Sequence, residues 1–361
     1  MRVIIAGGGT GGHVFPGIAV GRALRALGHT EILFVGTPQG LEAEAVPRAG
    51  FAFEAIRARQ VRGGGLRRAL IGGIAALLAV GAALRTIRRF RPQVVVGVGG
   101  YASVPLVIAA RLARVPTLLL EQNVIPGATN RLLGRFAQRV CTSFRETATS
   151  FPGARVVCTG NPVREEVLAV AAARAARPAA AERLVLLVVG GSGGAHRLNV
   201  AAVEAMARLA GRSRLRIVHQ TGAADAEETR RRYAEVGADA EVQPFFTDMA
   251  ALYDEADLVL CRAGATTIAE LLVVGLPAIL VPYPYAADDH QRRNAEAVQA
   301  VGAATLILDR DLTPERLADA LARLLDDADR RREMGAAARA LARPEAGRLV
   351  AEQCALLAGA A

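Results

Sequence analysis

Four short stretches of this 361-residue chain combine glycine with polar side chains in a way that suits phosphate binding. They are "GGGTGGH" at 7–13, "GGYASVP" at 99–105, "GGSGGAH" at 190–196 and "RAGATTIAE" at 262–270. Each follows an apolar run and precedes a helical pattern, so we expect each to be a loop that opens a helix. Glycines let the backbone approach a phosphate, and the free N–H groups and positive dipole end of the helix bind the anion.

The first loop also fits the G-x-G-x-x-G pattern of dinucleotide-binding folds, through Gly7, Gly9 and Gly12. That interpretation requires an acidic residue at the carboxyl end of the second strand, where the cofactor ribose binds. Glu31 is close by count, but it begins the second strand, whose far end reads Val-Gly-Thr. A nicotinamide or flavin cofactor is therefore disfavoured, while a purely structural tight turn stays open. His13 is expected in the first turn of the next helix, either for chemistry or only as a hydrogen bonder at the helix end.

The third loop fits G-x-S-x-G, the nucleophile turn of serine hydrolases, with Ser192 in the nucleophile position. Asp248 and His290 could nominally complete a triad in the required chain order. Because loops of this kind recur along the chain, phosphate or backbone binding explains all of them. In that interpretation Ser192 donates a hydrogen bond to a phosphate oxygen.

Polar residues near two later apolar runs suit a sugar nucleotide. Glu270 lies about one turn into the helix that the fourth loop opens, where its carboxylate could accept two hydrogen bonds from a ribose diol. Simple complementation of the helix dipole is the alternative. Gln291 and Asn294 are spaced i, i+3 and would share one helix face, where amides suit sugar hydroxyls or merely cap the segment. The nearby aspartates lack a further ligand set, so no metal is expected.

Charge and composition narrow the class of partner. Aromatic residues make up 4% of the chain, all 44 basic residues are arginine, and the formal net charge is +10. Nine arginines and no acid lie between Arg57 and Arg91, which suits an anionic partner. The uncharged stretch 69–84 inside this segment would span roughly 24 Å as a helix, short of a ~30 Å hydrocarbon core. We expect a core helix or a helix that docks on an anionic membrane surface. With no recognition module and few aromatics, nucleic acid is not an expected partner.

Apolar runs of strand length alternate with helical patterns in both halves of the chain. They read "RVIIA", "TEILFVG", "QVVVGV" and "TLLLEQN", then "RLVLLVV", "LRIVHQTG", "DLVLCR" and "PAILVPYP". The pattern predicts an α/β fold with parallel sheets covered on both faces, in two similar doubly wound domains. The Ala/Arg/Pro-rich stretch 168–184 is expected to be a helix plus a linker. The four cysteines are far apart, which predicts neither disulfides nor a zinc site and suits a reducing cytoplasm.

Taken together, seven motifs in order along nearly the whole chain resemble the MurG family of glycosyltransferases. They are "GGGTGGHVFPGIAV", "GVGGYASVP", "EQNVIPGATNRLL", "GNPVR", "GGSGGAHRLN", "RAGATTIAEL" and "DDHQRRNA". The resemblance implies a GT-B fold, with two Rossmann-like domains whose parallel sheets face across a cleft and no dinucleotide. It implies an N-terminal acceptor and membrane-side domain at 1–163, joined by the C-terminal helix 341–361, and a UDP-GlcNAc-binding domain at 164–340.

The same resemblance implies an activity and a place in the cell. The expected reaction is an inverting transfer of N-acetylglucosamine from UDP-N-acetylglucosamine (UDP-GlcNAc) to the C4 hydroxyl of the N-acetylmuramoyl-pentapeptide of lipid I. The product is lipid II, for peptidoglycan synthesis, and neither a metal nor a cofactor is expected in the site. The expected location is peripheral, at the cytoplasmic face of the bacterial plasma membrane.

Site residues carry over position by position. The expected contacts to UDP-GlcNAc are Thr10, Gly11, Gly12, Asn123, Arg164, Ser192, Phe246, Ala265, Thr266, Thr267, Ile268, Ala269, Glu270, Gln291 and Asn294. The expected cradle for the acceptor diphosphate is made of Gly9, Gly99, Gly100 and Tyr101. Many relatives have isoleucine where this chain has Phe246, but the implied contact to uracil is through the backbone, which tolerates the change.

The implied chemistry requires a base at the acceptor hydroxyl and stabilisation of the departing UDP. His13 is the expected general base, while Thr266, Arg164 and helix N-termini are expected to stabilise the leaving group. Three other functions stay open from the residues: another GT-B enzyme such as a UDP-sugar epimerase, a nicotinamide oxidoreductase, and a non-catalytic membrane-bound scaffold with a nucleotide pocket.

Overall fold

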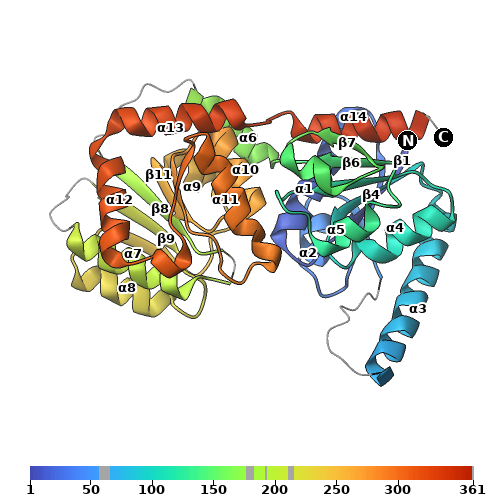
Figure 1. The fold of residues 1–361 in the computed structure, drawn as a ribbon, viewed down its shortest axis with the longest axis horizontal. Coiled ribbons are helices and arrows are strands. Elements are labelled where there is room, and N and C mark those ends of the chain that lie inside the picture. The colour runs from blue at the N-terminus through green and yellow to red at the C-terminus, as the bar shows by residue number, and fades with distance from the viewer. Residues whose placement is uncertain (57–65, 176–182, 192, 210–214, 360–361) are drawn as a thin grey trace. The chain divides into compact units, whose positions relative to one another are not determined.

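The structure is a computed structural model of the 361-residue chain (Figure 1). It describes the chain except for residues 57–65, 176–182, 192, 210–214 and 360–361, and for 66–74 it describes the backbone only. The chain divides into two compact units. Unit 1 comprises Met1–Arg164 together with Arg343–Ala361, and unit 2 comprises Glu165–Ala342.

Within the described residues, unit 1 is built on a seven-stranded sheet in the order β3-β2-β1-β4-β5-β6-β7, with every pair parallel. Its strands are β1 (Arg2–Gly7), β2 (Glu31–Gly36), β3 (Ala52–Ala55), β4 (Val94–Gly99), β5 (Thr117–Glu121), β6 (Arg139–Thr142) and β7 (Arg155–Cys158). Its helices are α1 (Gly11–Ala26), α2 (Glu42–Arg48), α3 (Leu66–Phe90), α4 (Ser103–Leu112), α5 (Ala128–Leu133), the 3-10 helix η1 (Glu146–Ser150) and α14 (Ala346–Gly359).

In its described part, unit 2 repeats this topology with a six-stranded parallel sheet in the order β10-β9-β8-β11-β12-β13. Its strands are β8 (Leu184–Val189), β9 (Leu215–Gln220), β10 (Ala240–Gln243), β11 (Leu258–Cys261), β12 (Ala278–Leu280) and β13 (Ala304–Leu306). Its helices are α6 (Glu165–Ala175), α7 (His196–Arg208), α8 (Ala226–Glu235), α9 (Met249–Glu255), α10 (Ala265–Val274), α11 (His290–Ala300), α12 (Pro314–Asp326) and α13 (Ala328–Leu341), with 3-10 helices η2 (Ala287–Asp289) and η3 (Asp309–Asp311).

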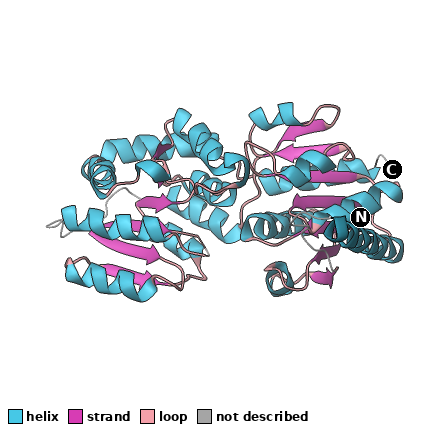
Figure 2. Ribbon diagram, turned by 60° about the horizontal axis from the view of Figure 1, so that its bottom comes forward, coloured by secondary structure: helices cyan, strands magenta, loops and turns pink. Residues whose placement is uncertain are grey.

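The sheet of unit 1 is buried on both faces, as Figure 2 shows by the helices on either side of its strands. Along β1, Val3 and Ile5 face a core that includes residues of α1 and α14, and Ile4 faces the core on the other side with α3 and α4. Alternate residues of a strand point to opposite faces, which is why a continuous apolar run is needed here. The C-terminal helix α14 contributes Val350 and Cys354, both fully buried, so the chain end completes the core of unit 1.

The expected α/β class with two Rossmann-like domains is confirmed. All eight apolar runs named above form strands of the two sheets. Five further strands were not predicted, namely β3, β6, β7, β10 and β13. They are three or four residues long and lie toward the sheet edges, where a strand needs less apolar sequence. In the stretch 168–184, the helix α6 ends at Ala175, and most of the remainder lies outside the described residues.

Strand order places the glycine-rich loops. In unit 1, β1 lies between β2 and β4, and in unit 2, β8 lies between β9 and β11. The chain therefore changes direction across the sheet between β1 and β4, and again between β8 and β11. Ligands of open parallel sheets bind at the carboxyl ends of such neighbouring strands. The four loops follow these four strands, so each unit has one pair of loops at its switch point.

Candidate functional site

The first two glycine-rich loops lie against each other in unit 1, because β1 and β4 pair side by side. A Cβ atom on Gly100 would lie 2.7 Å from the carbonyl oxygen of Gly8, and the Tyr101 ring approaches to 3.9 Å from the equivalent position on Gly9. The structure thus brings together Gly9, Gly99, Gly100 and Tyr101, the residues expected to hold a diphosphate.

His13 lies in the first turn of α1, as the sequence predicted, and packs on the second loop. A Cβ on Gly99 would lie 2.7 Å from His13 Cδ2, and Gly99 has a φ of +99°, so this position requires glycine for both space and conformation. The Nδ1 atom of His13 lies 3.2 Å from Thr10 Oγ1. In the tautomer whose Nδ1–H donates a hydrogen bond to Thr10 Oγ1, Nε2 is the ring nitrogen that has no proton and can act as a base.

A carboxylate that the sequence analysis did not identify holds the first loop. Glu42, from α2, is buried and accepts hydrogen bonds from the Gly9 N–H at 2.8 Å and from the N–H and hydroxyl of Thr37, each also at 2.8 Å. A Cβ on Gly8 would lie 2.1 Å from Glu42 Cδ, so the loop closes directly over the carboxylate. Burial acts to raise the pKa of Glu42, but these hydrogen bonds outweigh it and hold the pKa below its usual value.

In the described part of unit 1, this contact leaves no acid available for a cofactor ribose at the end of β2, in agreement with the sequence pattern. Thr37 follows the end of β2, where a cofactor-binding fold places its ribose-binding acid. An acid does reach this point, but it comes from α2, and both of its oxygens are used by the protein's own N–H and O–H groups. Glu42 lies in the stretch "GLEAEAVP", which has the composition of a short helix. Nothing in that stretch indicates that the Glu42 side chain turns back toward the first loop.

Asn123 is held by a second buried carboxylate, that of Glu121 at the end of β5. Glu121 accepts from the N–H of Asn123 at 2.9 Å, from its side-chain amide at 3.2 Å, and from Asn130 Nδ2 at 2.9 Å. Burial raises the pKa of Glu121, and the hydrogen bonds from these amides and from the Gly127 N–H only partly offset it. Glu121 and Asn130 therefore fix the position of a predicted donor contact.

Of two further predicted donor residues, the structure describes Arg164 but not Ser192. Arg164 belongs to unit 1, where its guanidinium carbon lies 5.0 Å from the centre of the Phe15 ring, next to the first loop. Such a stack keeps a guanidinium in place while leaving its charge intact. Ser192, the residue of both the phosphate and the hydrolase interpretations, lies outside the described residues.

The other members of the nominal hydrolase triad are engaged locally. Asp248 caps α9 by accepting from the Ala251 N–H at 3.0 Å. The Nδ1 atom of His290 lies 2.7 Å from the Ala287 carbonyl oxygen. Asp248 is thus the N-cap of α9, whereas His290 contacts the backbone of the preceding 3-10 turn.

In unit 2, Gln220 connects two of the predicted donor loops, although sequence reasoning missed it. Its Nε2 donates to the Gly191 carbonyl at 3.2 Å, and its Oε1 accepts from the Phe246 N–H at 3.0 Å. The Phe246 N–H is thereby occupied, so a backbone contact from this residue to a base would use the carbonyl oxygen. The amide of Gln220 sets the spacing between the loop after β8 and the loop after β10.

Two side-chain amides from α11 hydrogen-bond to the backbone of the turn between β11 and α10. Gln291 Oε1 accepts from the N–H of Ala263 at 3.2 Å and from that of Tyr283 at 2.9 Å, and Asn294 Nδ2 lies 3.4 Å from the Ala263 carbonyl. Both residues therefore support the predicted pyrophosphate turn. Asn294 is fully buried, and its predicted contact to the sugar stays a prediction. The amide nitrogen of Gln291 is the group on this face that can donate to a ligand.

The start of α10 presents the remaining predicted donor residues. Ala265, Thr266, Thr267 and Ala269 are half-buried, whereas Ile268 packs into the core and can contribute only its backbone. Gly264 precedes the helix in an extended conformation, so the first N–H groups of α10 point out of the turn. Glu270 is only 3% exposed, and its Oε2 accepts from the hydroxyl of Tyr253 at 3.0 Å.

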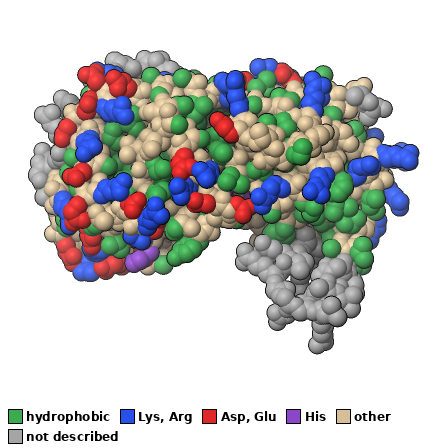
Figure 3. All heavy atoms as spheres, in the orientation of Figure 1, with side chains coloured by type: hydrophobic (Ala, Val, Ile, Leu, Met, Phe, Trp, Pro, Cys, Tyr) green, Lys and Arg blue, Asp and Glu red, His purple; other side chains and the backbone are tan. Residues whose placement is uncertain are grey.

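The arginine-rich segment forms the helix α3, whose described side chains divide between two faces. Ala83 and Ile87 are buried against the sheet, while Leu77 and Leu78 are 74% and 66% exposed. Figure 3 shows apolar and arginine side chains next to one another over the described part of α3 and the neighbouring α4. No helix in the described part of the chain is long and apolar enough to cross a membrane. Nor do the described residues include a group of three or more His, Cys, Asp or Glu that could hold a metal ion.

Comparison with known proteins identifies the family. The N-terminal domain of glycosyltransferase family 28 matches residues 3–142, and the C-terminal domain of that family matches residues 185–349. The UDP-N-acetylglucosamine--N-acetylmuramyl-(pentapeptide) pyrophosphoryl-undecaprenol N-acetylglucosamine transferase of Geotalea uraniireducens is 46% identical over 355 residues, covering 98% of this chain and 97% of its own.

Solved structures agree. MurG from Acinetobacter baumannii superposes with a TM-score of 0.81 at 34% identity, covering 98% of this chain and 99% of its own. The UDP-GlcNAc 2-epimerase of Neisseria meningitidis, solved with UDP-GlcNAc, has a TM-score of 0.70 but only 13% identity, covering 99% of this chain and all of its own, and so shares the fold alone. The chain therefore belongs to the MurG family, within glycosyltransferase family 28.

Proposed function

We propose that this chain transfers N-acetylglucosamine from UDP-GlcNAc to the C4 hydroxyl of the N-acetylmuramoyl-pentapeptide of lipid I, forming lipid II for peptidoglycan synthesis. The observation that carries the proposal is the identity to the Geotalea transferase, which extends along nearly the whole of both chains. Distant epimerases share the fold without that identity. Fold alone does not specify function, so the identity decides between the two enzyme classes.

We assign donor binding to unit 2. Glu270 accepts from the ribose diol, the N–H groups at the start of α10 with Thr266 and Thr267 bind the pyrophosphate, and Gln291 donates to the sugar. The carbonyl of Phe246 contacts uracil, because its N–H is held by Gln220. Asn294 is proposed as a second sugar contact on the same helix as Gln291, and like Glu270 it is buried in this structure.

We assign the acceptor diphosphate to the two loops at the switch point of unit 1. Gly99, Gly100 and Tyr101 provide one side of this cradle. Gly9 allows close approach on the other side, while its N–H stays with Glu42. The N-terminus of α1, which begins at Gly11, faces the same region and favours an anion. The family resemblance also assigns donor contacts to Thr10, Gly11, Gly12, Asn123 and Arg164 of unit 1.

The reaction is a single displacement with inversion at the anomeric carbon. His13 Nε2 takes the proton of the C4 hydroxyl as that oxygen forms the new glycosidic bond, and the bond from the anomeric carbon to UDP breaks. The electron pair leaves with UDP, whose developing negative charge is stabilised by the helix α10 N-terminus, Thr266 and Arg164. Imidazole titrates near neutral pH, which suits a base that must be unprotonated at the start of each turnover.

We propose that the enzyme binds peripherally to the cytoplasmic face of the plasma membrane through α3. The exposed Leu77 and Leu78 would enter the interface, while the exposed Arg85 and Arg88 pair with anionic headgroups. This arrangement presents unit 1 to a lipid-linked acceptor.

The test is transfer of labelled N-acetylglucosamine from UDP-GlcNAc to a lipid I analogue by the purified full chain. We expect a product that carries one added sugar, with UDP released in equal amount and no nucleotide cofactor added. Release of 2-epimerised UDP-sugar without transfer would support an epimerase instead. Binding of UDP-GlcNAc without any turnover would support a scaffold.

A further inference from the structure

The hydroxyl of Tyr253 donates a hydrogen bond to Glu270 Oε2 at 3.0 Å, and nothing in the mechanism above uses it. The two side chains come from different helices, α9 and α10, and the residues are 2% and 3% exposed. We propose that Tyr253 is a positioning residue that orients the Glu270 carboxylate toward the ribose of the nucleotide donor. This inference rests on the proposed ribose role of Glu270.

The contact is well placed to orient a carboxylate. A hydrogen bond to an ionised acceptor is stronger than one between neutral groups, and burial strengthens it further. Glu270 has three rotatable side-chain bonds, the last of which sets the plane of the carboxylate, and the hydrogen bond from Tyr253 to Oε2 restrains that plane. A carboxylate held in advance loses less rotamer freedom when the ribose hydroxyls bind.

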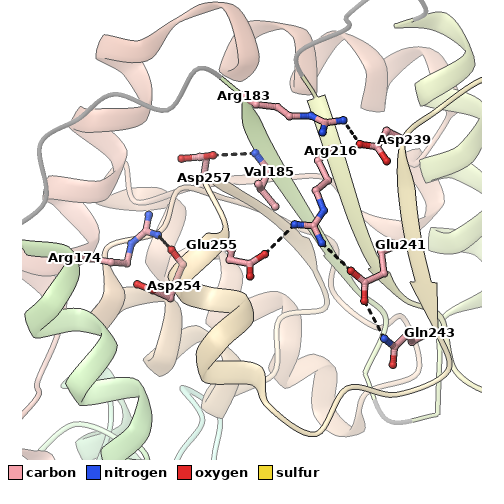
Figure 4. A network of polar contacts seen from close by, with 10 residues as sticks. All are labelled: Arg174, Arg183, Val185, Arg216, Asp239, Glu241, Gln243, Asp254, Glu255 and Asp257. Atoms are coloured by element: carbon pink, nitrogen blue, oxygen red, sulfur yellow. Dashed lines mark hydrogen bonds and ion pairs between the residues drawn. The ribbon is translucent and has the colours of Figure 1, made fainter.

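Arg174 holds Tyr253 in place through the Tyr253 backbone carbonyl. Arg174 Nη1, from α6, donates to the Tyr253 carbonyl at 3.2 Å. It also donates to the carbonyl of Asp254, a contact that Figure 4 shows. The helix α6 packs against both α9 and α10, so it fixes the distance between the two helices that carry the hydrogen-bonded pair. The ring of Tyr253 lies in the core of unit 2, which leaves its hydroxyl little freedom to move.

The rest of α9 is tied to the sheet of unit 2 at its C-terminal end (Figure 4). Arg216 on β9 pairs with Glu255 at 3.2 Å, and Asp257 accepts from the Val185 N–H of β8 at 2.8 Å. At the other end, Asp248 caps the helix. A short helix fixed at both ends and at its middle is a rigid support for one functional hydroxyl.

The test compares the affinities of uridine diphosphate and 2′-deoxyuridine diphosphate, measured by calorimetry on the full chain. Wild-type protein should prefer the ribonucleotide by about tenfold or more, because the deoxynucleotide leaves one carboxylate contact unmade. Tyr253→Phe removes only the hydroxyl. It should lower the affinity for uridine diphosphate by roughly fivefold to tenfold and leave that for the deoxynucleotide within about twofold, so that the preference collapses.

Tyr233→Phe is the matched control. Tyr233 is equally buried in unit 2, and its hydroxyl lies 3.0 Å from His219 Nδ1 rather than from Glu270. This variant should keep the full ribose preference. The variant Arg174→Gln leaves Tyr253 in place but removes its backbone support, and should reduce the preference by a smaller factor. It also provides a second measurement if Tyr253→Phe folds poorly by circular dichroism.

The outcomes distinguish the ribose role of Glu270 from the positioning role of Tyr253. If wild-type protein fails to distinguish the two nucleotides, the ribose role of Glu270 is wrong and the inference falls with it. If wild-type protein does distinguish them and Tyr253→Phe keeps the same preference, Glu270 binds ribose without help and only the positioning role of Tyr253 is overturned. A loss of preference in Tyr233→Phe equal to that in Tyr253→Phe would overturn it too.

Discussion

The N–H of Gly9 donates to the buried carboxylate of Glu42 at 2.8 Å, so an internal anion lies directly beneath the loop expected to accept an external one. The loop after β1 is thus held from within unit 1 by this carboxylate. Loops of this kind bind phosphates through backbone N–H groups whose directions must be fixed. Glu42 fixes them at the cost of one N–H that the ligand cannot use.

Replacing Glu42 with Gln should therefore impair catalysis while changing little in volume. Both carboxylate oxygens accept hydrogen bonds, so an amide nitrogen in either place would face an N–H or O–H donor. Buried hydrogen bonds to a charged group contribute about 1.5–3 kcal/mol each, which predicts at least a tenfold loss in kcat/KM for a lipid I analogue. Steady-state kinetics would measure it. Glu44→Gln, an exposed residue of the same helix paired with Arg48, is the control and should behave as wild type. Wild-type kinetics in Glu42→Gln would contradict the role.

His13→Ala should reduce turnover by roughly 100-fold or more while leaving UDP-GlcNAc affinity within about threefold, because general-base catalysis contributes about 10²–10⁴-fold. Rapid-quench kinetics and calorimetry would separate the two effects. His29→Ala, at the other end of α1, is the control histidine and should leave both unchanged. Near-normal turnover in His13→Ala would remove His13 as the base and leave it as the residue that packs the second loop.

Gln291→Glu should weaken binding of UDP-GlcNAc by about tenfold and weaken binding of UDP less. The carboxylate can still accept from Ala263 and Tyr283, but the amide N–H donor to the sugar is lost. Gln299→Glu is a close control, because Gln299 lies on the same helix and its Oε1 accepts from the Leu306 N–H at 2.8 Å. Equal losses for the two ligands would place Gln291 at the turn alone.

Replacing Leu77 and Leu78 together with Ser should release the protein from vesicles that contain anionic lipid. Burial of a leucine side chain contributes about 1.5–3 kcal/mol, so losing two predicts a drop in partition of more than tenfold. Flotation of the protein with vesicles of phosphatidylglycerol would measure it. Leu356→Ser, which removes an exposed leucine of α14, should not change binding. A separate test reverses charge at Arg85 and Arg88, both exposed; unaltered vesicle binding there would favour a core helix with no membrane role.

His219 should make the protein less stable in mild acid. It is fully buried between Tyr233 and Asn199, and burial lowers its pKa from 6.5 to about 3, with Asp225 opposing that shift. The unfolded chain takes up a proton below about pH 6.5 while the folded chain does not, so this residue's contribution to stability falls as pH drops from about 6.5 toward 3. The slope is at most about 1.4 kcal/mol per pH unit. Urea unfolding between pH 7 and pH 5 should show a shallower fall in His219→Gln, and parallel curves would contradict the assignment.

The sequence by itself determined the class of fold and the places of the glycine-rich loops. Buried parallel strands need apolar side chains on both faces, so β1, β2, β4, β5 and their counterparts in unit 2 appear as continuous apolar runs. Glycine is required wherever the backbone takes a left-handed conformation or passes close to another group, so the loops were equally visible. The alternation of runs and helices then placed the loops at the carboxyl edge of each sheet.

Tertiary structure alone decided which residues hold those loops. Glu42, Gln220 and Tyr253 each reach a predicted site from another element, across sequence separations of 33, 26 and 17 residues. The sequence also did not predict that Asn294 is buried. The i, i+3 spacing places Gln291 and Asn294 on one helix face, but it does not say which of the two packs against the core. A hydrogen-bond partner is selected by the packing of whole elements, and no local pattern of residue types records where a neighbouring helix will place its side chains.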